Sequence, residues 1–381
     1  MPRSDPMSSI PGRSAPVAPV AHAAPASSAP AASPVPPASP SGAPDDGRHL
    51  DPRLAIADGE GAVIAVRAPD EAWPVARDIT PHTAPAPADT YYDLPVVKPP
   101  PWRWFVPAYF HCGGLAGAAA VLGGAVALVA PDPALERRLR WMAVLGDAAG
   151  ASLLVGDLGR PARFHHMLRV FRPTSAMNLG TWILSSAGAI SALGLWRVLR
   201  GRRASAPVSA AGIASGALLA SYTGVLLGNT AIPIWSATRR RLPIWFAALS
   251  AASLGSLLEI VAPGVAPARA FTPVAKAAQL IAAGSVARAA HAEGVATPLR
   301  TGRSSALWRG ATWLGVASLA ATLWPRARAR PWLTGLAGVL GTTSALLSRF
   351  AIVEAGHASA ADPRATFVPQ RRTGAPPPRR S

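Results

Sequence analysis

The sequence is organised around a series of long apolar segments separated by short basic turns. A helix of about 20 apolar residues crosses the hydrocarbon layer of a bilayer. With 50% hydrophobic and 15% charged residues among 381, lipid is the expected solvent, and a multi-pass protein of the cell membrane is expected. The fold prediction is all-α, a polytopic transmembrane bundle of about eight helices at 104–130, 141–158, 177–199, 208–234, 244–261, 274–290, 307–324 and 332–353.

The two ends of the chain differ from this apolar body. Residues 1–88 are rich in Pro, Ala and Ser and show no helical period, so they cannot bury enough surface to offset the entropy of ordering. The predicted organisation is a disordered tail over 1–88, the transmembrane bundle over 89–360, and a basic, Pro-rich tail over 361–381.

Tryptophan and basic residues mark the expected span ends. Amphipathic rings prefer the membrane interface, and such positions are Trp102, Trp104, Trp141, Trp196, Trp235, Trp245, Trp308, Trp324 and Trp332. The sixth span carries Lys276 near one end and Arg288 near the other. Both side chains are expected to extend to the two interfaces.

The net charge of +18 does not indicate a nucleic-acid partner. The arginines form short clusters between the expected spans, as at 137–140, 160–172, 197–203, 239–241 and 326–330, where they meet solvent and lipid headgroups. An even number of spans puts both termini on one side. The low charge of the 263–273 loop and the basic C-terminal tail favour cytoplasmic termini.

The residue inventory excludes several redox centres. Cys112 is the only cysteine, which excludes an iron-sulfur cluster or a cysteine zinc site in this chain. Only His111 lies well inside a span, so the facing pair of a bis-histidine haem is missing, and no metal is expected. The closely spaced glycines at 113–117, 146–150 and 224–228 are interpreted as helix-packing positions.

A few polar side chains remain within the apolar segments. Ionisable groups at membrane depth are costly, so each is a functional hypothesis; the set is His111, Asp147, Asp157, Glu259 and Glu354, with Tyr109, Tyr222 and Asn229 as neutral companions. From the ~1.5 Å rise per residue, His111, Tyr222 and Asp157 are expected in the half of the membrane that holds the termini. Asp147 is expected near the middle, and Glu259 towards the other side. The alternative is structural: Asp157 pairs with Arg160, and Asp147 bonds a neighbouring helix.

One stretch resembles the signature of a known family. Asp157-Leu-Gly-Arg-Pro161, continued through Arg163, Phe164, His166, Met167, Leu168, Phe171, Pro173, Thr174, Ser175 and Met177, is similar to the NrfD/PsrC family of polysulfide and nitrite reductase membrane subunits. The resemblance extends to residues 92–117 and 354–370 and covers about 91–372.

The resemblance implies a membrane subunit that binds menaquinone or ubiquinone and exchanges electrons with an iron-sulfur subunit. That partner connects in turn to a molybdopterin-type or other oxidoreductase subunit. Tyr222 or His111 would hold a quinone oxygen, with Tyr109, Asn229 and Arg160 among the contacts, while Asp157, Asp147 and Glu259 would exchange protons. Two alternatives stay open: a membrane anchor of such a complex without quinone chemistry, and a secondary transporter.

Overall fold

The computed structural model describes residues 97–158, 160–326 and 330–366. All of them belong to one compact unit, 74–381, while the other unit, 1–73, lies outside the described residues. The predicted tail over 1–88 and most of the predicted C-terminal tail therefore also fall outside them.

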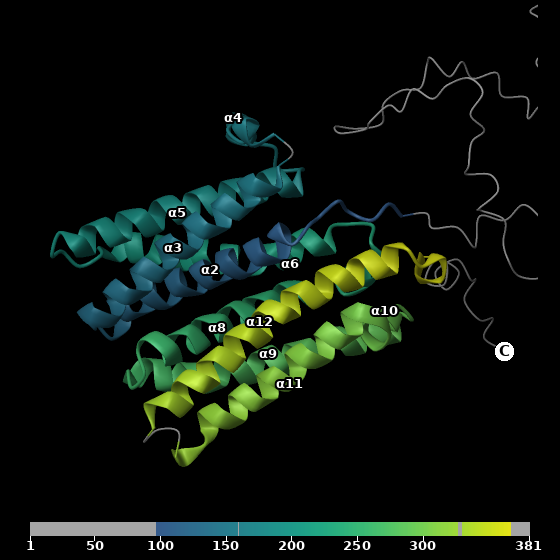
Figure 1. Ribbon diagram of the computed structural model, residues 1–381. Coiled ribbons are helices and arrows are strands. Elements are labelled where there is room, and N and C mark those ends of the chain that lie inside the picture. Colours follow the sequence, from purple (N-terminus) through teal and green to yellow (C-terminus); the bar gives the residue numbers. More distant parts are fainter. Residues whose placement is uncertain (1–96, 159, 327–329, 367–381) are drawn as a thin grey trace, which may run out of the picture. The chain divides into compact units, whose positions relative to one another are not determined.

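The described residues form a helical protein with eight long helices, as the sequence predicts (Figure 1). The long helices are α2 (Phe105–Val129), α3 (Pro133–Asp157), α5 (Ala176–Leu199), α6 (Ala206–Gly228), α8 (Leu242–Val261), α9 (Ala266–Ala292), α11 (Gly302–Leu323) and α12 (Pro331–Ala360). Short turns lie between them: η3 (Pro161–Arg163), α4 (His166–Arg169), α7 (Pro233–Ala237) and α10 (Thr297–Arg300).

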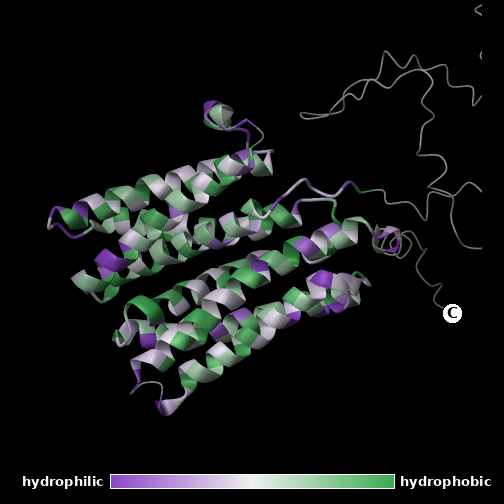
Figure 2. Ribbon diagram, viewed as in Figure 1, coloured by the Kyte–Doolittle hydropathy of each residue, from purple (hydrophilic) through white to green (hydrophobic). Residues whose placement is uncertain are grey.

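Six of the eight helices are long and apolar enough to cross a membrane: α2, α3, α5, α6, α8 and α12. The other two, α9 and α11, are long enough but less apolar than a span requires, with Arg269 and Lys276 on α9 and Arg303 and Arg309 on α11. Both nevertheless pack alongside the apolar helices, α9 against α8 and α11 against α12. In Figure 2 the most hydrophilic residues gather at the ends and turns of the bundle.

The eight helices pack as two groups of four with the same order of contacts. In the first bundle, α2 contacts α3 and α6, and α5 contacts the other sides of α3 and α6. In the second bundle, α8, α9, α11 and α12 repeat this ring. The two bundles meet where α2 and α6 pack on α8, and where α2 packs on α12. The amino-acid sequence shows no convincing internal repeat, but the helix contacts do repeat.

The two faces of the bundle are defined here by the helix ends that lie at each. The beginning of α2 and the end of α12 lie at the same end, here called the termini face (Figure 1). The end of α2 and the beginning of α12 lie at the opposite face. Successive long helices alternate in direction, so α3 ends and α5 begins at the termini face, while α8 ends and α9 begins at the opposite face.

Caps and small residues explain the local structure. Asp132 caps α3 by accepting hydrogen bonds of 3.0 Å from the backbone N–H groups of Ala134 and Leu135, and Pro133 occupies the first turn, where a missing N–H costs nothing. A Cβ on Gly117 of α2 would lie 2.5 Å from the Gly216 carbonyl oxygen on α6. Glycine thus allows these two helices to touch, as the packing interpretation expects.

One expectation about helix ends holds only in part and another is wrong. Trp235 and Trp245 lie near helix ends as expected, but both are fully buried among helices, and the Trp235 Nε1–H donates to the Ile352 carbonyl at 2.8 Å. The second helix begins at Pro133, eight residues before the expected start, so Arg140 lies inside it and is fully buried. Glycines on two other helices, Gly194 and Gly212, lie against the Arg140 guanidinium and make the room that it fills.

Candidate functional site

An apolar cavity lies in the first bundle between α3 and α5. Its volume is about 320 Å³, and it occupies the half of the bundle towards the termini face. Aliphatic side chains of α3 and α5 form its walls, and residues at α4 cover it. The lining residues are Val144, Asp147, Ala148, Ala151, Leu154, Val155, Leu158, Phe164, Met167, Leu168, Thr181, Leu184, Ser185, Gly188 and Ala189.

Asp147 is the charged residue in this lining. Asp147 is 6% exposed, and neither of its carboxylate oxygens has a hydrogen-bond partner of ordinary geometry among the described residues. The Ser191 hydroxyl faces it from α5. Gly188 leaves space beside it, since a Cβ there would lie 3.8 Å from the Asp147 Cβ. A buried carboxylate without partners is costly, so this group has capacity to bind a donor that enters the cavity.

Two tyrosines lie behind Asp147 in the interior of the first bundle. Tyr109 of α2 is buried within electrostatic range of both Asp147 and Tyr222. The Tyr222 hydroxyl on α6 donates a 2.5 Å hydrogen bond to the Ala176 carbonyl at the beginning of α5. Asp147, Tyr109 and Tyr222 are therefore grouped, and each comes from a different helix.

His111 does not join this group. It lies on α2 within electrostatic range of Arg349 on α12, where the first bundle meets the second. The His111 Nδ1 has no hydrogen-bond partner among the described residues. Arg349 is fully buried there and donates to the Ser250 hydroxyl at 3.1 Å and to the Ala345 carbonyl at 3.1 Å.

The remaining polar candidates of the first bundle lie at its termini face. Asp157 is the last residue of α3. Its carboxylate interacts with the backbone N–H and with the guanidinium charge of Arg103, rather than with Arg160. Arg160 is exposed in the turn that follows α3. Asn229 is the exposed C-terminal cap of α6. None of these three residues lines the cavity.

Glu259 belongs to the second bundle. Its Oε2 lies 2.5 Å from the Lys276 Nζ, and its Oε1 accepts a 2.7 Å hydrogen bond from the Thr322 hydroxyl. The expectation that Lys276 extends to an interface is wrong, because the residue is 2% exposed and paired inside the bundle. Its helix begins at Ala266, so the backbone of Lys276 lies about 15 Å from that end.

The segment 167–172, here called the covering segment, was not recognised from the sequence as part of a site. Asn178 of α5 holds this segment: its Nδ2 donates to the Met167 carbonyl at 2.8 Å and to the Val170 carbonyl at 3.0 Å, and its Oδ1 accepts from the Arg172 N–H at 2.7 Å. Met167 is thereby kept over the cavity. The sequence did contain one signal for this segment, the side-chain amide of Asn178 in the first turn of an expected span.

The geometry favours binding of an apolar molecule that carries a hydrogen-bonding group. The cavity has an apolar lining, lies along the membrane-spanning part of α3 and α5, and contains one buried carboxylate. Among the described residues, no three His, Cys, Asp or Glu side chains come together as a metal site.

Comparison with known proteins supplies the family. A family model described as polysulfide reductase, of the NrfD type, matches residues 88–362. No curated protein matches the chain. The match spans the whole helical region and includes the cavity, its covering segment and the second bundle. This chain belongs to the NrfD family of polysulfide reductase membrane subunits, the integral membrane part of a redox complex.

Proposed function

We propose that this subunit exchanges electrons and protons between a membrane quinone, menaquinone or ubiquinone, and an iron-sulfur partner subunit. The observation that carries the proposal is the apolar cavity between α3 and α5 with the unpartnered Asp147 carboxylate in its wall. The family match supports this proposal, because the NrfD family consists of membrane subunits of redox complexes.

The residues present fit a quinone ring. A volume of about 320 Å³ is at the lower end of ordinary ligand pockets, which suits a ring whose isoprenoid tail stays in lipid. Leu154, Leu184 and Met167 supply apolar contacts to ring faces. When bound, a quinone accepts or releases two electrons and two protons, and its ring oxygens need hydrogen-bond partners.

Asp147 is the proposed acid-base group of the site. As a carboxylic acid it donates to a ring oxygen, and as a carboxylate it accepts the proton of a ring hydroxyl. Tyr109 lies behind it, within electrostatic range. Asp157 lies ten residues further along α3, about 15 Å closer to the termini face, where it exchanges the proton with water.

The partner is proposed to dock on the termini face. The cavity lies in that half of the bundle, so electron transfer to this face is shortest. Exposed arginines there, at 160, 169 and 172 and at 239–241, would attract an acidic partner surface. Through that iron-sulfur subunit the electrons would reach a molybdopterin-type or other catalytic subunit.

The test fills the cavity and leaves the carboxylate in place. Ser185→Phe should displace quinone from the purified complex, because Ser185 lines the cavity, whereas Ser186→Phe should keep it, because the neighbouring exposed Ser186 does not. Quinone is extracted and quantified, and quinol-dependent reduction of the partner is measured beside it. Equal quinone content in both variants would place the site elsewhere. No quinone in the unsubstituted complex would favour a membrane anchor without quinone chemistry.

A further inference from the structure

The interior of the second bundle holds an ion pair in which four helices take part. Lys276 Nζ of α9 donates to Glu259 Oε2 of α8 at 2.5 Å, to Thr322 Oγ1 of α11 at 2.8 Å, and to the Ala337 carbonyl of α12 at 3.4 Å. Thr322 in turn donates to the second Glu259 oxygen. Every proton of the ammonium therefore has an acceptor.

A buried ion pair rarely stabilises a protein more than apolar residues of the same volume would, because removing two charges from water is costly. In membrane helices such groups mark ion or proton paths more often than packing. A proton path also needs water to reach the pair.

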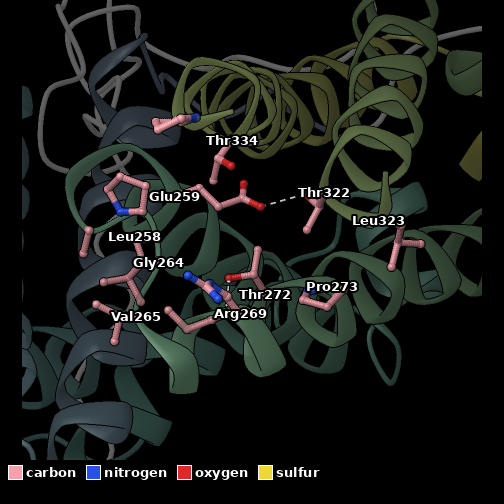
Figure 3. Close-up of a pocket in the computed structure, with 14 residues that line it drawn as sticks. Leu258, Glu259, Gly264, Val265, Arg269, Thr272, Pro273, Thr322, Leu323 and Thr334 are labelled. Atoms are coloured by element: carbon pink, nitrogen blue, oxygen red, sulfur yellow. Dashed lines mark hydrogen bonds between the residues drawn. The ribbon is translucent and has the colours of Figure 1, made fainter. Parts of the chain in front are cut away.

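A cavity of about 230 Å³ extends from the opposite face to Glu259. Figure 3 shows Glu259 among the residues that line it. It lies among the end of α8, the beginning of α9, the end of α11 and the beginning of α12. Glu259 and Thr322 line it, whereas Lys276 does not, so the carboxylate separates the cavity from the amine. Arg269, Thr272 and Thr334 also line it, which makes the wall polar enough to hold water.

Polar side chains continue inward from the pair. Gln279 lies one turn beyond Lys276 on α9 and donates to the Ser344 hydroxyl at 3.0 Å. Ser318 donates to the same Ala337 carbonyl that Lys276 contacts. The Ser256 hydroxyl is buried without a hydrogen-bond partner among the described residues, which is the usual mark of an internal water position.

We propose that Glu259 and Lys276 form a proton-exchange site supplied with water from the face opposite the termini. The Lys276 ammonium gives one proton to a water molecule inside the bundle and becomes an amine. Glu259 accepts one proton from a hydronium ion in the cavity and passes it to that amine through their shared hydrogen bond. One proton enters from the cavity for each proton that leaves inward, and the ion pair is restored.

The charges around Glu259 suit this cycle. Among the described residues that line the cavity or contact the carboxylate, the charged ones are Lys276 and Arg269, both cationic and both from α9. The contacts from α11 and α12 are the neutral hydroxyls of Thr322 and Thr334. Among these residues no second carboxylate faces Glu259.

Access of water can be tested without turnover. In a Cys112→Ser background, Thr334→Cys should react with a charged, membrane-impermeant thiol reagent applied at the opposite face, and not when it is applied at the termini face. Leu336→Cys is the matched control, because Leu336 lies two residues away on the exposed side of α12 and does not line the cavity. An unreactive Thr334→Cys, or reaction from the termini face, would overturn the proposal.

Proton exchange is tested in the complete complex, and this arm rests on the proposed quinone function. In liposomes with the termini facing outward, turnover should change the internal pH. Glu259→Gln with Lys276→Gln, which keeps the hydrogen-bonding groups without charge, should slow that change about tenfold or more while electron transfer continues. An unchanged internal pH response would overturn the proposal. If the unsubstituted complex shows no electron transfer, the result counts against the quinone function. The thiol labelling then tests the proton-exchange site by itself.

Discussion

The two four-helix bundles share one arrangement of contacts but contain different cavities. The first has an apolar cavity towards the termini face with an unpartnered carboxylate, Asp147. The second has a polar cavity towards the opposite face with a fully hydrogen-bonded carboxylate, Glu259. A helical framework of this kind does not determine chemistry; the few polar residues within it do. The predictions below test whether this contrast reflects a division of work.

The largest expected difference between the bundles is in stability. Glu259→Ala removes the partner of a buried ammonium and should destabilise the protein by about 3–5 kcal/mol. Asp147→Asn should cost about 1 kcal/mol or less, because among the described residues neither carboxylate oxygen has a hydrogen bond of ordinary geometry to lose. Thermal unfolding of the two variants in detergent measures the contrast. Glu259→Ala with Lys276→Met should recover much of the loss, since it removes both charges. Similar melting temperatures for Glu259→Ala and Asp147→Asn would contradict the account.

A smaller effect is expected at the cover of the first cavity. Asn178→Ala removes the three hydrogen bonds that hold the 167–172 segment, each worth about 1 kcal/mol in a folded protein. The cover then loosens, so quinone affinity should fall while the helices stay folded. Titration of quinone into the purified complex measures this affinity. Thr312→Ala is the control, because its hydroxyl bonds only its own helix on the exposed side of α11. Equal affinities in both variants would mean that the cover does not position the ligand.

The positions of the helices could be predicted from the sequence, but the positions of their buried charges could not. Apolar segments in the sequence indicate all eight long helices, and six of them are long and apolar enough to cross the hydrocarbon layer. Arg140 and Lys276 escaped prediction for one reason. A hydropathy pattern treats cations as helix ends. Arg140 instead pairs with Glu136 in the room left by two glycines of other helices, and Lys276 pairs with Glu259 on α8.

The sequence identifies polar residues of the candidate site, but it does not show which of them lie together. Asp147 and Tyr222 were candidates and do lie near Tyr109, while His111 at the same depth turns to the other side of α2. Depth follows from counting residues along a helix, but the direction that a side chain takes depends on helix rotation. The rotation of α2 cannot be predicted from its sequence, because small apolar residues lie on several sides of this helix and several of its sides are buried.

The most direct test of the central claim is quinol-dependent reduction of the iron-sulfur partner by the Asp147→Asn complex. Asparagine keeps the size of the side chain and its hydrogen bonding but cannot exchange a proton, so the rate should fall about 100-fold or more, with quinone still bound and the complex assembled. The double variant Glu259→Gln with Lys276→Gln should keep electron transfer in the same assay. Full turnover in Asp147→Asn would contradict the assignment of the first bundle as the quinone site.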